Sequence, residues 1–348
     1  MLGSLSYHKY YRKRCPKREI QNVFMEIFTM LYNPIGGGVS IYFTICFITN
    51  ILFVRLSTKW DHLLDLVATS ELDEYIDSSM KFKCNFVTVA IMSFSFVEHA
   101  IQKTFKILMV YNCHWSDINL HSYQQYLRAT YTYAFDLNLP YSIGFGILIQ
   151  ILSLIASFIW SYSHAFIICI SFYLTSILEL LNKKIISCEG KDLPPSHWRA
   201  LREDYNRATL LIRSFDDVIN SIMFIVTAND LFFVCCQLYY LIGFLIGYEF
   251  IVYLIISVIF YTTRFFSVLL IAAKIHTASL VVTPSLYNVA TSSYCCEVQR
   301  FIEKINGDTV ALTGLNFFYT TRDLILSVIG TIVTYELVLL QFQRDQIT

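Results

Sequence analysis

The chain has 348 residues, of which 55% are hydrophobic and only 15% are charged. Soluble domains carry about a quarter charged residues, so this composition excludes a soluble protein and indicates an integral membrane protein. The formal net charge is zero, which gives no indication of a nucleic-acid partner, and the ten cysteines lack the spacing of metal ligands. We therefore expect no metal and no cofactor.

Six stretches are long and apolar enough to cross a bilayer, which requires about 20 residues. In chain order they are 39–54, 84–110, 139–163, 218–246, 250–273 and 324–342. The third begins an uncharged stretch that continues to Glu179, so its helix should extend beyond the bilayer. The sequence therefore predicts an all-α, polytopic membrane protein with six clear spans.

The basic residues predict the orientation of these spans, because cytoplasmic loops carry an excess of Lys and Arg. Fifteen basic residues fall in the loops 55–83, 183–213 and 274–322, against four on the alternate side. The first group of loops is therefore expected in the cytoplasm, and the C-terminus outside.

The N-terminal segment 1–33 conflicts with this count. Its six basic residues, between Lys9 and Arg18, also favour the cytoplasm, so one more crossing is required before residue 39. Only 20–32 is available, and its roughly 13 residues are shorter than the minimum of about 17. Either this segment is a remnant of a first span, or the chain begins downstream of a true one.

The remaining regions follow from these assignments. Segment 183–217 is a predicted cytoplasmic anchor of charged helices around Pro194 and Pro195, with 292–306 as an amphipathic helix packed against it. In chain order the predicted regions are spans in 34–182 with an extracellular loop near 111–138, a transmembrane hairpin in 218–273, a second anchor segment in 274–323, a pore helix in 324–343 and an extracellular tail in 344–348.

The last span carries Thr334, Glu336 and Gln341 in an otherwise apolar helix. A polar group in hydrocarbon must find a partner or water, so such residues face a bundle interior or an aqueous path. Thr334, Val338 and Gln341 fall on one helical stripe, which favours a pore-lining face. Glu336 lies about 160° from Val338 and is expected to face the bundle. The alternative is that these polar groups join neighbouring helices through hydrogen bonds.

The same span resembles the C-terminal signature of the insect gustatory receptors, which is Thr-Tyr, several hydrophobic residues and then Gln-Phe. Thr334, Tyr335, Gln341 and Phe342 match it, and Glu336 directly after the tyrosine is similar to the sugar-receptor branch. Further similar segments are Ala311-Leu312-Thr313-Gly314, Phe317-Phe318, Thr321-Arg322, Phe96-Val97-Glu98-His99-Ala100, Tyr131-Thr132-Tyr133-Ala134-Phe135 and Asn229-Asp230-Leu231-Phe232-Phe233.

The resemblance covers roughly residues 35 to 343. It implies a seven-helix channel subunit of the gustatory and odorant receptor type, with a cytoplasmic N-terminus and an extracellular C-terminus. It also implies a homo- or heterotetramer that conducts cations when a sugar binds, in the plasma membrane of chemosensory neurons. Four copies of the stripe would surround a pore, with Gln341 and Phe342 as its constriction, because an amide ring holds water and an apolar ring can gate by dewetting.

A sugar site needs hydrogen-bonding groups beside aromatic faces, and the outward halves of the spans offer both. The candidate ligand-binding residues are Glu98, His99, Tyr133, Asp136, Tyr141, Trp160, Asp230, Gln237, Tyr253, Tyr261 and Arg264. Each has a structural alternative. Asp230 and Arg264 could form a buried ion pair, Glu98 and His99 could satisfy each other, and the tyrosines could belong to an interfacial belt.

Other classes of membrane protein fit less well. A G-protein-coupled receptor requires the reverse orientation, and a membrane enzyme requires clustered His and Asp, whereas the eight histidines are scattered. A transporter could explain Glu98, Asp230 and Arg264, although no internal repeat is visible. A co-receptor subunit without its own ligand response remains open.

Overall fold

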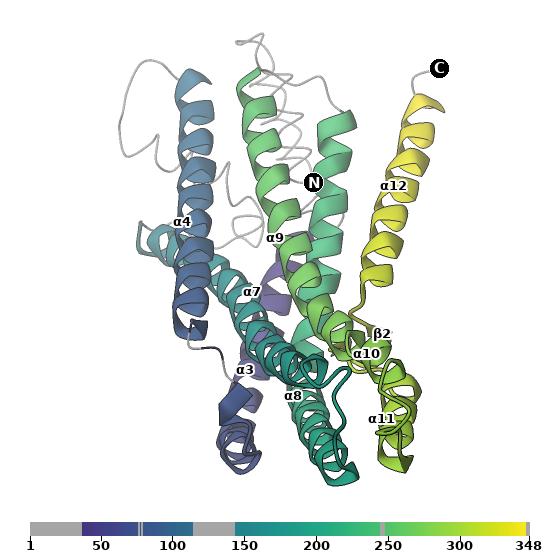
Figure 1. Cartoon of the computed structure of the whole chain (residues 1–348). Coiled ribbons are helices and arrows are strands. Elements are labelled where there is room, and N and C mark those ends of the chain that lie inside the picture. The colour runs from purple at the N-terminus through teal and green to yellow at the C-terminus, as the bar shows by residue number, and fades with distance from the viewer. Residues whose placement is uncertain (1–36, 76, 78, 114–142, 244–247, 346–348) are drawn as a thin grey trace.

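The computed structural model describes residues 37–75, 77, 79–113, 143–243 and 248–345 (Figure 1). The predicted remnant of a first span, at 20–32, therefore lies outside the described residues, as does most of the predicted extracellular loop. The described part consists of long helices that run side by side toward one end of the molecule, where shorter elements join them.

Six long helices account for the predicted spans. They are α3 (Gly37–Thr69), α4 (Met80–Cys113), α7 (Ile143–Ile186), α8 (Pro195–Gly243), α9 (Tyr248–Leu280) and α12 (Arg322–Asp345). Even α12, with 24 residues, is roughly 36 Å long, which exceeds the hydrocarbon thickness of about 30 Å. Within the described residues, four of the helices, α4, α7, α8 and α9, also meet a hydropathy criterion for crossing a membrane.

Two helices extend far beyond a bilayer, as predicted for the third span. The 44 residues of α7 and the 49 residues of α8 correspond to roughly 66 Å and 74 Å. Their adjoining ends form the anchor together with α10 (Thr283–Tyr287) and α11 (Cys296–Gly307), opposite to the C-terminus (Figure 1). A short 3-10 turn, η1 (Asp73–Tyr75), connects α3 to α4 at the same end.

The anchor has a well-packed apolar core. The buried residues of α11 are Val298, Phe301, Ile302 and Ile305, a spacing that places them on one helix face against α8. The Phe301 ring lies 5.3 Å from that of Tyr205, whose hydroxyl donates a hydrogen bond to the Ser279 carbonyl oxygen at 3.0 Å. The predicted amphipathic helix at 292–306 is thereby confirmed, although it begins four residues later.

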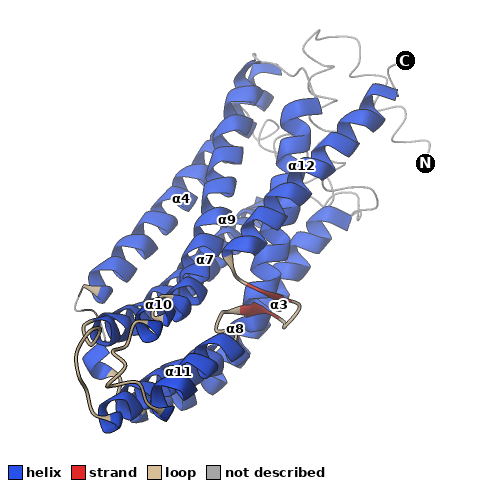
Figure 2. Cartoon of the chain, turned by 45° about the vertical axis from the view of Figure 1, so that its right-hand side comes forward, coloured by secondary structure: helices blue, strands red, loops and turns tan. Residues whose placement is uncertain are grey.

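A two-stranded hairpin connects the anchor to the last helix. Strands β1 (Thr313–Gly314) and β2 (Phe318–Tyr319) pair antiparallel, and α12 begins at Arg322, directly after them. Figure 2 shows these strands in red at the base of α12. The hairpin was not predicted, because its strands are too short to produce an alternating pattern.

Candidate functional site

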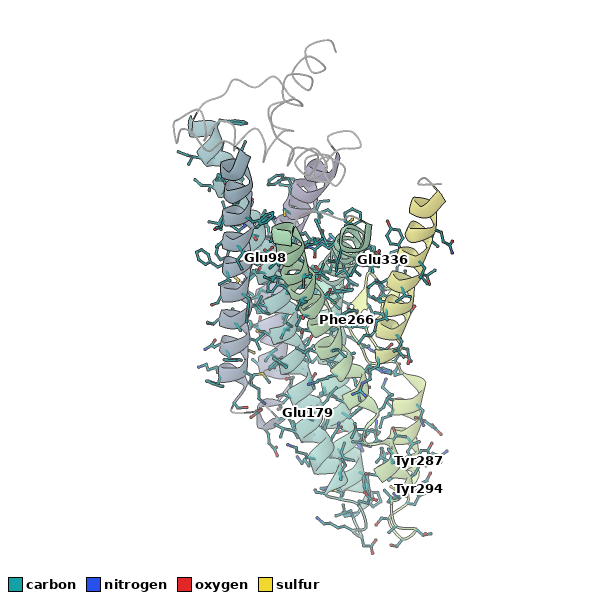
Figure 3. The ribbon with its side chains drawn as sticks, turned by 90° about the horizontal axis from the view of Figure 1, so that it is seen from above. Glu98, Glu179, Phe266, Tyr287, Tyr294 and Glu336 are labelled. Carbon is teal, nitrogen blue, oxygen red and sulfur yellow. The ribbon has the colours of Figure 1, made fainter. Side chains whose placement is uncertain are left out.

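The last helix presents two chemically different faces. Ile325, Val328, Ile332 and Glu336 are buried, and their spacing of three, four and four residues places them on the side that packs against α8 and α9. Figure 3 shows Glu336 on this inner side of α12. The prediction that Glu336 faces the bundle is confirmed.

The predicted pore stripe lies on the outer face of α12. Thr334, Val338 and Gln341 are exposed, and the Thr334 hydroxyl donates to the Gly330 carbonyl oxygen at 2.8 Å. That bond satisfies the hydroxyl's proton within its own helix while leaving oxygen lone pairs available outside it. Phe342 belongs to α12, but its side chain lies outside the described residues.

Glu336 is an unusual buried group. Its side chain is 7% exposed, and neither carboxylate oxygen has a hydrogen-bond partner among the described residues. Burying a carboxylate without a partner is unfavourable, so Glu336 lowers the stability of the folded subunit.

A second buried polar cluster joins α7 to α8. His164 is fully buried, and its Nε2 lies 2.5 Å from Oδ2 of Asp230, which is 3% exposed. The His164 Nδ1 lies 2.6 Å from the Trp160 carbonyl oxygen. Because a carbonyl oxygen only accepts, Nδ1 carries a proton, and Nε2 and Asp230 share another proton between them.

The alternative of an ion pair between Asp230 and Arg264 is wrong. Within the described residues Arg264 forms no ion pair, and its guanidinium instead lies 4.8 Å from the ring centre of Tyr261 and 5.3 Å from that of Phe260. The Tyr261 ring also stacks on Phe233 of α8, with centroids 6.4 Å apart. Asp230 is bonded to the imidazole of His164 on α7 rather than to Arg264. The rings of Tyr261 and Phe260 on α9 stabilise the Arg264 guanidinium instead.

The remaining described candidates lie on α4, α7, α8 and α9, which pack against one another. On α4, Glu98 is buried and His99 half-buried, and Ser95 on the same helix accepts a 2.6 Å hydrogen bond from Ser161 of α7. Trp160 is 4% exposed, and its indole Nε1 has no hydrogen-bond partner among the described residues. Trp160 therefore offers a donor inside the bundle.

Two contacts join α9 to its neighbours toward the end of the bundle opposite the anchor. The Gln237 amide donates to the Ser257 hydroxyl at 3.3 Å, and the Tyr253 ring stacks on Phe105 of α4 with centroids 5.2 Å apart. The predicted residues Tyr133, Asp136 and Tyr141 lie outside the described residues. Most contacts of the described candidates are thus with residues outside the candidate set, such as His164, Ser257 and Phe105.

Comparison with known proteins decides the family. The model of the trehalose receptor family matches residues 23–348. The chain belongs to this family. Gustatory receptor for sugar taste 64f of Drosophila melanogaster is 31% identical over 335 residues, which cover 94% of this chain and 71% of that protein. Gustatory receptor 5a for trehalose, from the same fly, is 35% identical over 209 residues, or 60% of this chain and 47% of the relative.

The receptor also shares its fold with a solved structure. The insect olfactory receptor OR5 from Machilis hrabei superimposes with a TM-score of 0.64 at 14% identity, covering 94% of this chain and 88% of that chain. Its complex with eugenol gives a TM-score of 0.57. These similarities confirm the predicted fold class and the sugar branch of the insect gustatory receptors. The receptor is thus a multi-pass membrane chemoreceptor and not an enzyme.

The receptor has a groove whose lining includes none of the predicted ligand residues. A cavity of about 700 Å³ lies between α3, α4 and α7. It is lined by Asn50, Phe53, Leu56, Ser57, Trp60, Met92, Phe158, Ile159, Tyr162 and Phe166. The Asn50 amide and Ser57 hydroxyl both donate to carbonyl oxygens of their own helix. This largely apolar lining suits a sugar poorly, because sugar hydroxyls need several polar partners.

Three polar residues between α4, α7, α8 and α9 were not predicted from the sequence. His164, Ser161 and Ser257 are all buried and all bonded to another helix. His164 stands within a span of otherwise uncharged residues, and that isolation was the available signal, because a polar ring inside a membrane requires a partner.

Proposed function

We propose that this receptor is one subunit of a sugar-gated cation channel, in which four subunits place α12 around a central pore. The supporting observation is the exposed face of α12. Thr334 and Gln341 point away from the subunit's own bundle, where lipid would leave an amide unsatisfied. A pore, formed by four copies of that face, supplies water instead.

The chemistry of the stripe fits cation conduction and gating. Thr334 and Gln341 would provide rings of hydroxyl and amide oxygens, which attract cations, and Val338 would provide an apolar ring between them. Phe342, one residue beyond Gln341, would complete the constriction with a second apolar ring that excludes water in the closed state.

The sugar would bind between the outer halves of α4, α7, α8 and α9. Trp160, Gln237 and the charged groups Glu98 and Arg264 offer hydrogen bonds there. The rings of Tyr253 and Tyr261 offer flat faces for a pyranose, and His99 lies beside Glu98. Asp230 would act through His164, and Tyr133, Asp136 and Tyr141 would contribute from the extracellular side. Because one relative is named for trehalose, that disaccharide is the first ligand to test.

Binding would open the channel by favouring the conformation in which α12 moves outward. A change from a mostly closed to a mostly open population requires about 5 kcal/mol of differential affinity. A sugar with several hydrogen bonds can supply this amount if the open state makes more of them.

Cation current in a cell that expresses this chain alone tests the proposal. Trehalose, sucrose, glucose and fructose are applied under voltage clamp, and at least one is expected to evoke current. Gln341→Ala should change conductance or selectivity. Val333→Ala, an exposed residue of α12 outside the stripe, is the matched control and should leave both unchanged. Saturable sugar uptake without channel current would contradict the proposal, and current that requires a second gustatory subunit would indicate a heterotetramer.

A further inference from the structure

The hairpin at the base of α12 is held by one face of α8. Asp216 accepts a hydrogen bond at 2.6 Å from the Thr313 backbone N–H through Oδ1, and a second at 2.8 Å from the Thr313 hydroxyl through Oδ2. Four residues along α8, the Asn220 carbonyl oxygen accepts from the Leu315 N–H at 3.3 Å. Four residues further, the Phe224 ring contacts Phe317 at 5.8 Å.

With this spacing, the hairpin contacts α8 at three positions along the helix rather than at one. Residues at i, i+4 and i+8 lie on one helical face, so α8 holds the hairpin along three successive turns. Asp216 is 8% exposed and Thr313 is 4% exposed, which protects their hydrogen bonds from competition with water. Hydrogen bonds to a charged acceptor are among the stronger ones in proteins.

The hairpin is closed by backbone hydrogen bonds and leads directly into α12. The Thr320 N–H donates to the Leu312 carbonyl oxygen at 2.8 Å, and α12 begins two residues later at Arg322. Asp230 follows Asp216 by 14 residues in the same helix, α8, which corresponds to roughly 21 Å along the helix axis. One continuous helix therefore connects the buried pair with His164 to the base of α12.

We propose that Asp216 and Thr313 form a latch that transmits movement of α8 to the pore helix. This inference rests on the proposed channel function and assigns to it two positioning residues, neither of which touches ligand or pore. When sugar binding displaces α8, the latch carries the base of α12 with it. Without the latch, α8 moves and α12 follows less completely.

Sugar dose-response curves of four variants test the latch. Asp216→Ala and Thr313→Val are each expected to raise the half-maximal sugar concentration about fivefold or more and to lower the maximal current, at unchanged surface expression. Thr313→Ser keeps both hydrogen bonds and should behave as the natural protein. Asp217→Ala, which removes the exposed carboxylate of the next residue, is the matched control.

The double variant Asp216→Ala with Thr313→Val distinguishes a shared role from two separate ones. If the two residues act through one contact, the double variant resembles the more affected single variant, whereas multiplied effects would overturn the latch. An unchanged dose-response for Asp216→Ala in a channel that responds normally to sugar would overturn it as well.

Hydrogen–deuterium exchange of the purified receptor tests the latch without any current. Asp216→Ala should accelerate exchange both in 313–320 and in the first turns of α12, and Asp217→Ala should not. Acceleration confined to the hairpin would overturn the latch, because α12 would then be held independently. Absence of sugar-evoked current in the natural protein, both alone and with a second gustatory subunit, would contradict the channel function, while this experiment would still decide the mechanical link.

Discussion

At the scale of single residues, the buried pair of His164 and Asp230 has the strongest consequences for stability. Removing the imidazole leaves a carboxylate without its partner inside the bundle, so His164→Ala should lower the free energy of unfolding by about 3–5 kcal/mol. Asp230→Asn should cost less than about 1.5 kcal/mol, because the amide can donate a hydrogen bond to Nε2. Thermal unfolding in nanodiscs measures both. Equal losses in the two variants would contradict this account of the pair.

Neutralising Glu336 should not lower stability, in contrast to neutralising Asp230. Its carboxylate has no hydrogen-bond partner among the described residues, so Glu336→Gln keeps the volume, removes the charge and should leave stability unchanged or higher. Glu336→Ala creates a cavity and should lower the free energy of unfolding by about 2 kcal/mol. If both variants destabilise the receptor equally, the carboxylate pairs with a partner outside the described residues or in another subunit of the proposed channel.

At the scale of elements, the hairpin depends on a glycine that sequence patterns do not explain. A Cβ at Gly314 would lie 2.2 Å from the Phe318 ring, too close for any real contact. Gly314→Ala should therefore cost about 1–3 kcal/mol of stability through displacement of the ring. Adding Phe318→Ala should recover part of this loss. Gly330→Ala, where a Cβ meets nothing within 4 Å, is the control and should stabilise α12 slightly.

The elements also show which features the sequence could predict. The six spans and the extension of α7 could be predicted, because they depend only on the hydropathy and charge of residues close together in the chain. The inward direction of Glu336 follows from helical spacing alone. The hairpin and the partner of Asp230 could not be predicted, because each depends on contacts between residues far apart in the chain. His164 and Asp230 are 66 residues apart, and Asp216 and Thr313 are 97 apart.

At the scale of the whole molecule, the charges divide the receptor into an aqueous end and a membrane part. Among the described residues, every ion pair except that of His164 with Asp230 involves the anchor elements or the adjoining turn between α3 and α4. Glu98 and Glu336 lie toward the opposite end from Tyr287 and Tyr294 of the anchor (Figure 3). The excess of Lys and Arg at the anchor end is the feature that orients a multi-pass protein.

This polarity predicts which end faces the cytoplasm. The turn between α7 and α8 reaches solvent at Gly190, whose φ of 72° and open surroundings make it a suitable insertion point for an epitope. An epitope inserted after Gly190 should be stained only after permeabilisation, because the basic anchor is expected inside the cell. An epitope appended to Thr348 should be stained on intact cells. The reverse pattern would place the anchor outside and would contradict the proposed extracellular sugar pocket, since the halves of α4, α7, α8 and α9 opposite the anchor would then face the cytoplasm.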